Sequence, residues 1–277
     1  MRVCFLLERG SPPRLNPILV EVFARLEKRG IKVAVLYPEE ALLRLDTLQV
    51  EADLYLLKSD TELALSLAVA LESLGARVLN SSRASALAKD KVQAAVVLQQ
   101  AGLPAPRSWT TTWPAQLASE LVDGPLIFKP HRGYHGAGIA VAETASVMPK
   151  AEDYPGLAFV QRYLARARTD LKVFAMGEDI FGVRKAFASN SFLQMGTPSP
   201  LSSAVEEIAR RCGRAFGLTL YGLDIAEDEM GAHIVDVNYF PGYRGVPGAA
   251  LWMADYIESY AREQRPCHAL ATREASS

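Results

Sequence analysis

The sequence predicts an α/β protein in which a parallel α/β unit is followed by an α+β half. In the first 80 residues, short apolar segments alternate with amphipathic ones, which is the order of strands and helices in a parallel sheet. After residue 125, segments of strand length follow one another with few helices between them, as in an antiparallel sheet. Hydrophobic residues make up 49% and charged residues 22% of the 277 residues, which is typical of a globular protein.

The N-terminal unit has clear element boundaries. Pro17 suits the first turn of a helix, where no backbone donor is required, and Gly30 and Gly75 suit helix ends. We expect strands over 3–7, 31–36, 54–57 and 78–79, and helices over 17–30 and 62–74. No Gly-x-Gly-x-x-Gly motif follows the first strand, which argues against a dinucleotide-binding fingerprint there.

The sequence after residue 80 predicts helices separated by strands that pair with their neighbours along the chain. Met176 to Asp179 would turn a hairpin, and the strands over 222–226 and 233–237 would form a second antiparallel pair. We expect helices over 85–100, 115–121, 203–216 and 246–262, and strands over 108–112, 126–129, 139–142, 158–162, 171–175 and 180–187.

Charge and cysteine content exclude several classes of protein. Lys and Arg number 30 against 31 Asp and Glu, which argues against non-specific nucleic-acid binding because that requires an excess of cations. Cys4, Cys212 and Cys267 are scattered and form no CxxC motif, which fits a reducing cytoplasm. No secretion signal or apolar run of membrane-spanning length is visible, so we expect a cytoplasmic protein without a membrane partner. Monomer and homo-oligomer remain equally open.

A glycine-rich loop follows the strand that ends at Lys129. Residues 129–139 read Lys-Pro-His-Arg-Gly-Tyr-His-Gly-Ala-Gly-Ile. Glycines allow backbone amides to face a phosphate, and a preceding lysine adds a charge to the same group. The loop is not a Walker A motif, because no Gly-Lys-Ser/Thr ends it. The alternative is a hairpin turn whose glycines satisfy local sterics.

Two later strands carry acidic residues within apolar surroundings. Asp236 and Asn238 are two positions apart and therefore point to one face, and Asp224 lies on a strand that can pair beside them. Two carboxylates and one amide oxygen form a hard oxygen site suited to Mg²⁺. The alternative is that these side chains cap nearby backbone groups.

The order of these motifs resembles ATP-grasp enzymes over about residues 80–262. The resemblance rests on Lys91, Lys129, the glycine-rich loop, Gln161-Arg162-Tyr163-Leu164, Asp224 and Asp236-x-Asn238. It implies an ATP-grasp fold with an N-terminal parallel α/β domain over 1–80, a central lobe over 81–163 and a C-terminal lobe over 164–277.

The resemblance also implies roles for these residues, with ATP held between the two lobes. Lys91 and Lys129 would contact the nucleotide, and the loop containing Gly133, Gly136 and Gly138 would cover its phosphates. Gln161, Arg162, Tyr163 and Leu164 would form a hinge that reads adenine through backbone groups. Asp224, Asp236 and Asn238 would hold Mg²⁺.

Two branches of the superfamily compete for the substrate. Ile234 to Tyr243, with Asp-x-Asn in place of the more common Glu-x-Asn, resembles the inositol tris/tetrakisphosphate kinases. Segments 56–60, 171–174 and 183–185 are similar to that branch too. By contrast, Lys129-Pro130-x-x-Gly-x-x-Gly-x-Gly resembles the ribosomal-protein glutamate ligase branch.

The number of candidate cations favours a kinase acting on an inositol-polyphosphate-like substrate. A polyphosphate needs several cations, whereas a carboxylate needs one arginine. The expected substrate-binding residues are Lys58, Arg132, His135, Lys172, Arg184, Lys185, Asn238, Gly242 and Arg244, and the expected catalytic residues are Lys129, Arg184, Asp236 and Asn238. The alternatives are a carboxylate-amine ligase that forms an acyl phosphate and a nucleotide-binding module without turnover.

Overall fold

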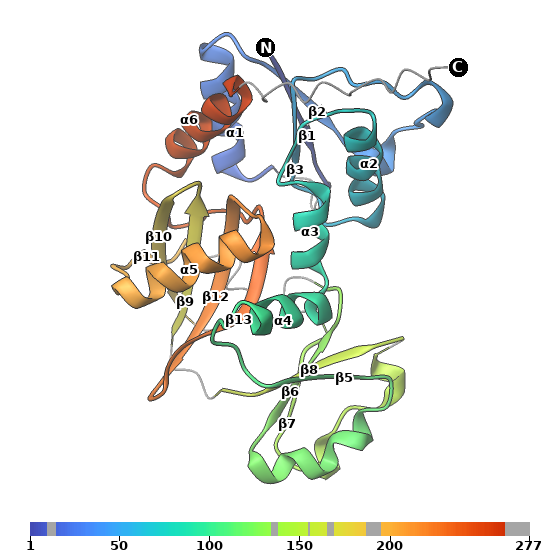
Figure 1. Ribbon diagram of the computed structural model, residues 1–277, viewed down its shortest axis with the longest axis vertical. Coiled ribbons are helices and arrows are strands. Elements are labelled where there is room, and N and C mark those ends of the chain that lie inside the picture. Colours follow the sequence, from blue (N-terminus) through green and yellow to red (C-terminus); the bar gives the residue numbers. More distant parts are fainter. Residues whose placement is uncertain (10–14, 134–137, 155, 165–168, 187–194, 264–277) are drawn as a thin grey trace, which may run out of the picture.

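In a computed structural model, the described strands form three sheets that are stacked along the long axis of the molecule (Figure 1). The structure describes residues 1–9, 15–133, 138–154, 156–164, 169–186 and 195–263. A parallel sheet lies at one end, a five-stranded antiparallel sheet in the middle and a four-stranded antiparallel sheet at the other end. The predicted division into a parallel α/β unit and an α+β half is confirmed.

The parallel sheet has the strand order β2-β1-β3-β4. It consists of β1 (Arg2–Leu6), β2 (Lys32–Leu36), β3 (Leu54–Leu57) and β4 (Val78–Leu79), with helices α1 (Pro17–Lys28) and α2 (Glu62–Ser73). Strands β1 and β3 are almost wholly buried, which explains their continuous apolar sequences. Helix α1 begins at Pro17, as predicted. Asn16 precedes it and caps the helix by accepting a hydrogen bond from the Ile18 amide.

The predicted helix over 85–100 is wrong, because the structure has two helices in its place. Helices α3 (Ser82–Lys89) and α4 (Lys91–Gln100) meet at Asp90, which has extended backbone angles. The Asp90 carboxylate accepts hydrogen bonds from the amides of Val92 and Gln93 and thereby caps α4. The break turns the chain and places Lys91 in the first turn of α4.

The four-stranded sheet forms a small lobe with its own core, seen at the bottom of Figure 1. Its order is β5-β8-β6-β7. The strands are β5 (Ser108–Thr111), β6 (Leu126–Pro130), β7 (Ala140–Ala142) and β8 (Ala158–Arg162). Phe128 and Val160 face the core on one side, so Lys129, Phe159 and Gln161 face the central sheet on the other. The short helix predicted over 115–121 is a 3-10 helix over Pro114–Asp123.

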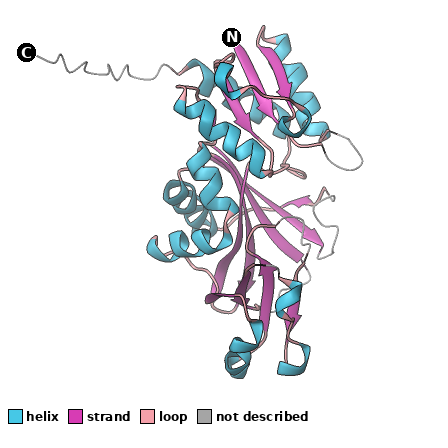
Figure 2. Cartoon of the chain, turned by 90° about the vertical axis from the view of Figure 1, so that its right-hand side faces the viewer, coloured by secondary structure: helices cyan, strands magenta, loops and turns pink. Residues whose placement is uncertain are grey.

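The central sheet has the order β11-β10-β9-β12-β13. It contains β9 (Thr169–Met176), β10 (Asp179–Ala186), β11 (Thr197–Pro198), β12 (Leu220–Asp228) and β13 (Gly231–Tyr239), with helices α5 (Ser203–Phe216) and α6 (Ala249–Arg262). The β9–β10 hairpin and the β12–β13 pair are antiparallel as predicted, whereas β11 was not predicted. Figure 2 shows this sheet between the N-terminal unit and the small lobe.

One continuous core joins the N-terminal unit to the central sheet. The buried Asn80 amide contributes to the joint, since its Nδ2 donates to the Leu220 carbonyl and its Oδ1 accepts from the Thr219 and Leu220 amides. Helices α3 and α4 pack on this larger body, against α2, α5 and β13. None of the described helices has the length and apolar character needed to cross a membrane.

Candidate functional site

Two acidic side chains meet at the centre of the β12–β13 pair. Asp224 lies directly opposite Asp236, and Asn238 lies opposite Gly222 two positions along. The two carboxylates are partly exposed, and both face lysines: Lys172 Nζ lies 2.7 Å from Asp224 Oδ1, and Lys91 Nζ lies 3.7 Å from Asp236 Oδ1. The structure thus places all three predicted metal ligands on one sheet face.

A β-bulge shapes the strand that carries Asp236. Pairing continues from Asp224 opposite Asp236 to Ile225 opposite Ile234, so Val235 has no partner on β12. The Val235 carbonyl instead accepts a hydrogen bond from Lys129 Nζ at 3.1 Å, and the Ile234 amide donates to the Pro104 carbonyl. The bulge therefore provides a backbone acceptor that links the central sheet to the small lobe.

Lys129 bridges the two antiparallel sheets. Its side chain extends from β6, is 5% exposed, and donates to Gln161 Oε1 on β8 at 2.7 Å. A buried ammonium is costly unless hydrogen bonds compensate it, and Gln161 and Val235 supply two. The predicted nucleotide lysine is thus held between the lobes.

The ends of the glycine-rich loop are fixed by contacts with neighbouring elements. Lys91 Nζ donates to the Gly133 carbonyl at 3.0 Å, and the Tyr154 hydroxyl donates to the Gly138 carbonyl at 2.8 Å. Gly138 has a φ of +70°, and a Cβ there would lie 2.9 Å from the Pro130 ring, so glycine is required on both counts. His135 and Gly136 lie outside the described residues.

The predicted hinge surrounds a small pocket. Arg162, Tyr163 and Leu164 line it together with Ile127 and Val235. The amides of Arg162 and Tyr163 already donate to the Arg107 and Pro125 carbonyls, so a base would have to use other backbone groups of the segment. The Arg162 guanidinium faces the opposite way, toward the Gly124 and Glu120 carbonyls and the Trp109 ring.

Two arginines expected on the acceptor side are elsewhere. Arg184 forms an ion pair with Glu227 at 2.7 Å and, as the residue before Lys185, lies on the opposite face of β10. The prediction that both basic residues of the Val-Arg-Lys segment face one substrate is therefore wrong. Arg132 contacts the carboxylates of Asp90 and Glu62 at 3.3–3.4 Å.

The remaining described cations gather where β10 approaches the loop after β13. Lys185 is 3% exposed, and burial lowers its pKa to about 8. The nearby positive charges of Lys172 and Arg244 lower this pKa further, whereas Asp224 opposes the change. Lys58 lies on the other side of the same loop, with Nζ 5.8 Å from the centre of the Phe240 ring.

The loop after β13 has an unusual backbone. Phe240 and Tyr243 have positive φ values of 49° and 52°, although neither is a glycine, and both side chains are fully buried. The Tyr243 hydroxyl donates to the Ala175 carbonyl, and Asn16 Nδ2 donates to the Gly242 carbonyl at 2.8 Å. Asn16 carries no sequence signal that would place it beside this loop; its position before Pro17 indicates only a helix cap.

Comparison with known proteins accounts for this arrangement. Residues 188–259 match the family described as inositol 1,3,4-trisphosphate 5/6-kinase ATP-grasp domain. The chain resembles a RimK domain ATP-grasp protein from Sphaerobacter thermophilus, with a TM-score of 0.74 and 17% identity over 93% of this chain and 100% of that one. The ligase PsnB, in complex with a minimal precursor, Mg and ADP, gives a TM-score of 0.68 and 18% identity over 94% and 97%. These likenesses show that the chain has the ATP-grasp fold.

Relatives found by sequence carry a more specific name. The chain is 28% identical over 193 residues to a probable α-L-glutamate ligase of Shewanella amazonensis, covering 64% of each chain. It is 31% identical over 193 residues to the corresponding protein of Xanthomonas euvesicatoria, covering 64% of this chain and 65% of that one. The matched region therefore spans slightly less than two thirds of these relatives, whose names fit the ligase alternative better than the kinase.

The donor set of this candidate site suits Mg²⁺. Among the described residues, no group of three or more His, Cys, Asp or Glu side chains could hold a metal ion. Two carboxylates and the exposed Asn238 amide nevertheless fit magnesium, because Mg²⁺ commonly takes one or two protein carboxylates and fills its shell with phosphate and water.

Proposed function

We propose that this protein is an ATP-dependent carboxylate-amine ligase that joins its two substrates through an acyl phosphate. The observation that carries the proposal is the pairing of charges in the cleft. Among the described candidate cations, Arg132 and Arg184 are held by carboxylates away from the acceptor side, and Lys172 faces Asp224. Lys58, Lys185 and Arg244 lie outside these pairs, and Lys172 would join them only when a metal ion occupies Asp224. This is a smaller set than a substrate with several phosphates calls for, since each phosphate carries a charge of about −1.5 to −2.

The acceptor side also offers charges of both signs. Lys185 lies near Arg244, which belongs to the loop after β13. Burial lowers the pKa of the Lys58 ammonium, while the carboxylates of Asp60 and Glu8 oppose that change from nearby. Cations close to carboxylates match an amino acid, which carries both an amine and a carboxylate. The names of the sequence relatives support the same class of substrate.

The proposed reaction has two steps. A carboxylate oxygen of the first substrate attacks the γ-phosphorus of ATP, which breaks the bond to the bridging oxygen and releases ADP. Lys91, Lys129 and the amides of the glycine-rich loop would stabilise the charge on the transferred group, since this step depends mostly on positioning and electrostatics. The amine of the second substrate then attacks the acyl carbon, loses a proton and displaces inorganic phosphate.

Asp224, Asp236 and Asn238 would hold magnesium in this reaction. The ion, when bound, would neutralise charge on the nucleotide phosphates. Both carboxylates face lysine ammonium groups in the structure, so Lys172 and Lys91 would be released from these pairs. Lys91 could then turn toward a phosphate while its backbone remains fixed at the start of α4.

A kinase remains the second candidate, because the inositol kinase family matches the segment that contains β12 and β13. The two functions differ in their products. With Mg²⁺-ATP, a ligase needs two co-substrates and releases one inorganic phosphate per ADP, whereas a kinase needs one acceptor and releases no phosphate. We expect phosphate release with pairs of amino acids or peptides and none with inositol phosphates.

Hydroxylamine sharpens this experiment. It replaces the amine and converts an acyl phosphate into a hydroxamate, so one carboxylate substrate suffices for detection. The Asp236→Asn variant serves as the control for contaminating ATPases, because it retains the shape of the side chain and loses its charge. ADP formation with an inositol phosphate alone, without phosphate release, would establish the kinase and reject the ligase.

A further inference from the structure

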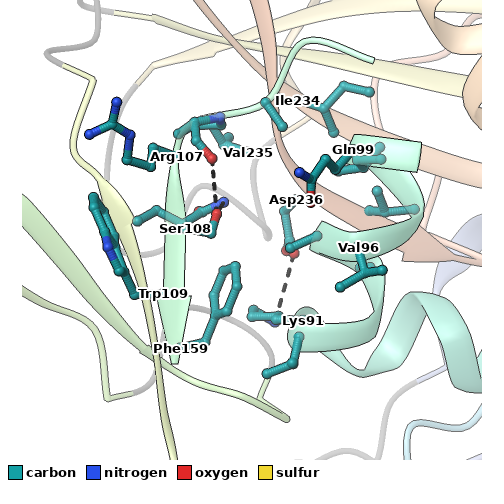
Figure 3. A pocket seen from close by; sticks show the side chains of 18 of the residues that line it. Lys91, Val96, Gln99, Arg107, Ser108, Trp109, Phe159, Ile234, Val235 and Asp236 are labelled. Atoms are coloured by element: carbon teal, nitrogen blue, oxygen red, sulfur yellow. Dashed lines mark hydrogen bonds and ion pairs between the residues drawn. The ribbon is translucent and has the colours of Figure 1, made fainter. Parts of the chain in front are cut away.

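A second cavity lies on the α4 side of the Lys129–Gln161 bridge. It has a volume of about 500 Å³, within the range of about 300–1,000 Å³ that is usual for small-molecule sites. Helix α4, strand β5 and strand β13 enclose it (Figure 3). Neither Lys129 nor the hinge residues 162–164 line it, whereas they do line the small hinge pocket. Gln161 borders both spaces and separates them.

The lining of this cavity is apolar with a few uncharged polar groups. Phe159, Leu103 and Ile234 are buried and form its apolar walls. Ser108 and Gln99 contribute a hydroxyl and an amide, and Figure 3 shows Ser108 on the opposite side of β5 from Arg107 and Trp109. The charged side chains at the border toward the glycine-rich loop, Lys91 and Asp236, form a pair with each other.

Hydrogen bonds connect the cavity to the nucleotide lysine. Ser108 Oγ donates to the Pro106 carbonyl at 2.9 Å and accepts from Gln161 Nε2 at 3.3 Å. The other end of the Gln161 amide accepts from Lys129 Nζ at 2.7 Å. A ligand that competes for Ser108 or for Gln161 Nε2 would reorient the amide and thereby withdraw an acceptor from Lys129.

We propose that this cavity is a regulatory site for a flat, uncharged molecule that carries an amide or a similar pair of donor and acceptor. The apolar walls accommodate the ring, and Ser108, Gln161 and Gln99 match the donor and acceptor. A carboxylate in the same position would lose the amide donor, and its charge would be costly to bury among the apolar walls. Ligand binding at this site does not depend on the proposed ligase activity. The effect of the ligand on nucleotide affinity requires only that Lys129 contact the nucleotide.

Benzamide and benzoate are matched probes, because they share a ring and differ in the amide and the charge. We expect benzamide to bind with a Kd in the millimolar range, as for other small fragments, and benzoate at least about tenfold more weakly. The Ala95→Phe variant fills the cavity from α4 and should abolish benzamide binding. Gln100→Phe changes an exposed residue of the same helix that does not line the cavity, and it should bind benzamide normally.

The proposed effect on nucleotide binding is tested by measuring the Kd for ADP, in the presence of Mg²⁺, at increasing benzamide concentrations. If the two sites are coupled, the Kd for ADP changes as benzamide is added and then stays constant once the second site is saturated. We expect a total change of about fivefold or more. Ser108→Ala should reduce that factor while benzamide still binds. The proposal is overturned if benzamide does not bind, if Ala95→Phe binds it normally, if benzoate binds equally well, or if the Kd for ADP rises without limit as in direct competition. It is also overturned if benzamide binds without changing the Kd for ADP.

Discussion

Replacing Lys185 by methionine separates the contribution of this residue to stability from its contribution to activity. Lys185 extends from β10 into the cleft, where it is 3% exposed, and burial lowers its pKa to about 8. Lys172 and Arg244 add positive charge nearby, so the protonated form is disfavoured further, and Asp224 opposes this only in part. Methionine has a similar length and no charge, and should remove the cost of burying the ammonium.

The magnitude follows from the difference between the ordinary lysine pKa of 10.5 and the value of about 8 in the folded protein. At about 1.4 kcal/mol per pKa unit, the buried charge costs about 3 kcal/mol of folding free energy. Below pH 8 both states are protonated and the whole cost applies. Between pH 8 and 10.5 the unfolded chain binds more protons than the folded one, so the wild type gains stability as the pH rises. After allowing for hydrogen bonds lost with the ammonium group, we expect Lys185→Met to raise the free energy of unfolding by about 1–3 kcal/mol at pH 7.

Urea unfolding at pH 7 and pH 10 measures this difference. The advantage of Lys185→Met should fall to less than about half its pH 7 value at pH 10, because the wild-type lysine has lost its proton there. Lys32→Met, at an exposed position of β2, is the control and should change stability by less than about 0.5 kcal/mol at either pH. An advantage of Lys185→Met that is absent at pH 7, or that does not shrink at pH 10, would refute the reasoning. Activity should fall in this variant even as stability rises.

Three further changes test the site. Asp236→Ala should reduce turnover, measured as steady-state ADP release, more than about 100-fold, which corresponds to about 2.7 kcal/mol of transition-state stabilisation. The thermal unfolding temperature of this variant should stay within a few degrees of the wild-type value. Arg184→Ala should leave kcat and KM within about twofold, because its partner Glu227 lies on the opposite sheet face from Lys185; a large loss would return Arg184 to the site. Asn16→Ala removes both the α1 cap and the bond to Gly242, and should cost about 1–2 kcal/mol in urea unfolding and raise the KM of the acceptor more than that of ATP.

Local sequence signals predicted most of the fold. Strand β8 and helix α5 occupy the predicted residues 158–162 and 203–216, because their apolar spacing and flanking residues are unambiguous. The break at Asp90 could not be predicted from periodicity, since alanine-rich segments on both sides continue the helical pattern. Asp90 is a good cap, but whether it caps α4 or extends one helix depends on the packing of α3 and α4.

The candidate site was predictable to the extent that it depends on strand alternation and pairing. Asp224 and Asp236 face each other because the hairpin register puts them opposite. The bulge at Val235 has no local signal, and it provides the acceptor for Lys129. Arg184 and Lys185 are adjacent in sequence and alternate in the strand, so the same rule that places Lys185 in the cleft places Arg184 outside it.

The substrate class depends on how many lysines and arginines of the site are not neutralised by ion pairs within the protein. Amino-acid composition alone does not provide that number. A lysine in contact with a carboxylate contributes little attraction for an incoming anion, because the pair is nearly neutral beyond its own length. Arg132 is held by Asp90 and Glu62, and Lys89 pairs with the same Glu62, so this cluster has two charges of each sign and attracts a polyphosphate only weakly. Lys185 loses its proton more easily than an ordinary lysine, because burial lowers its pKa and the nearby cations Lys172 and Arg244 lower it further. These pairings support the proposed ligase, whose first step takes a single carboxylate, over a kinase that takes a polyphosphate.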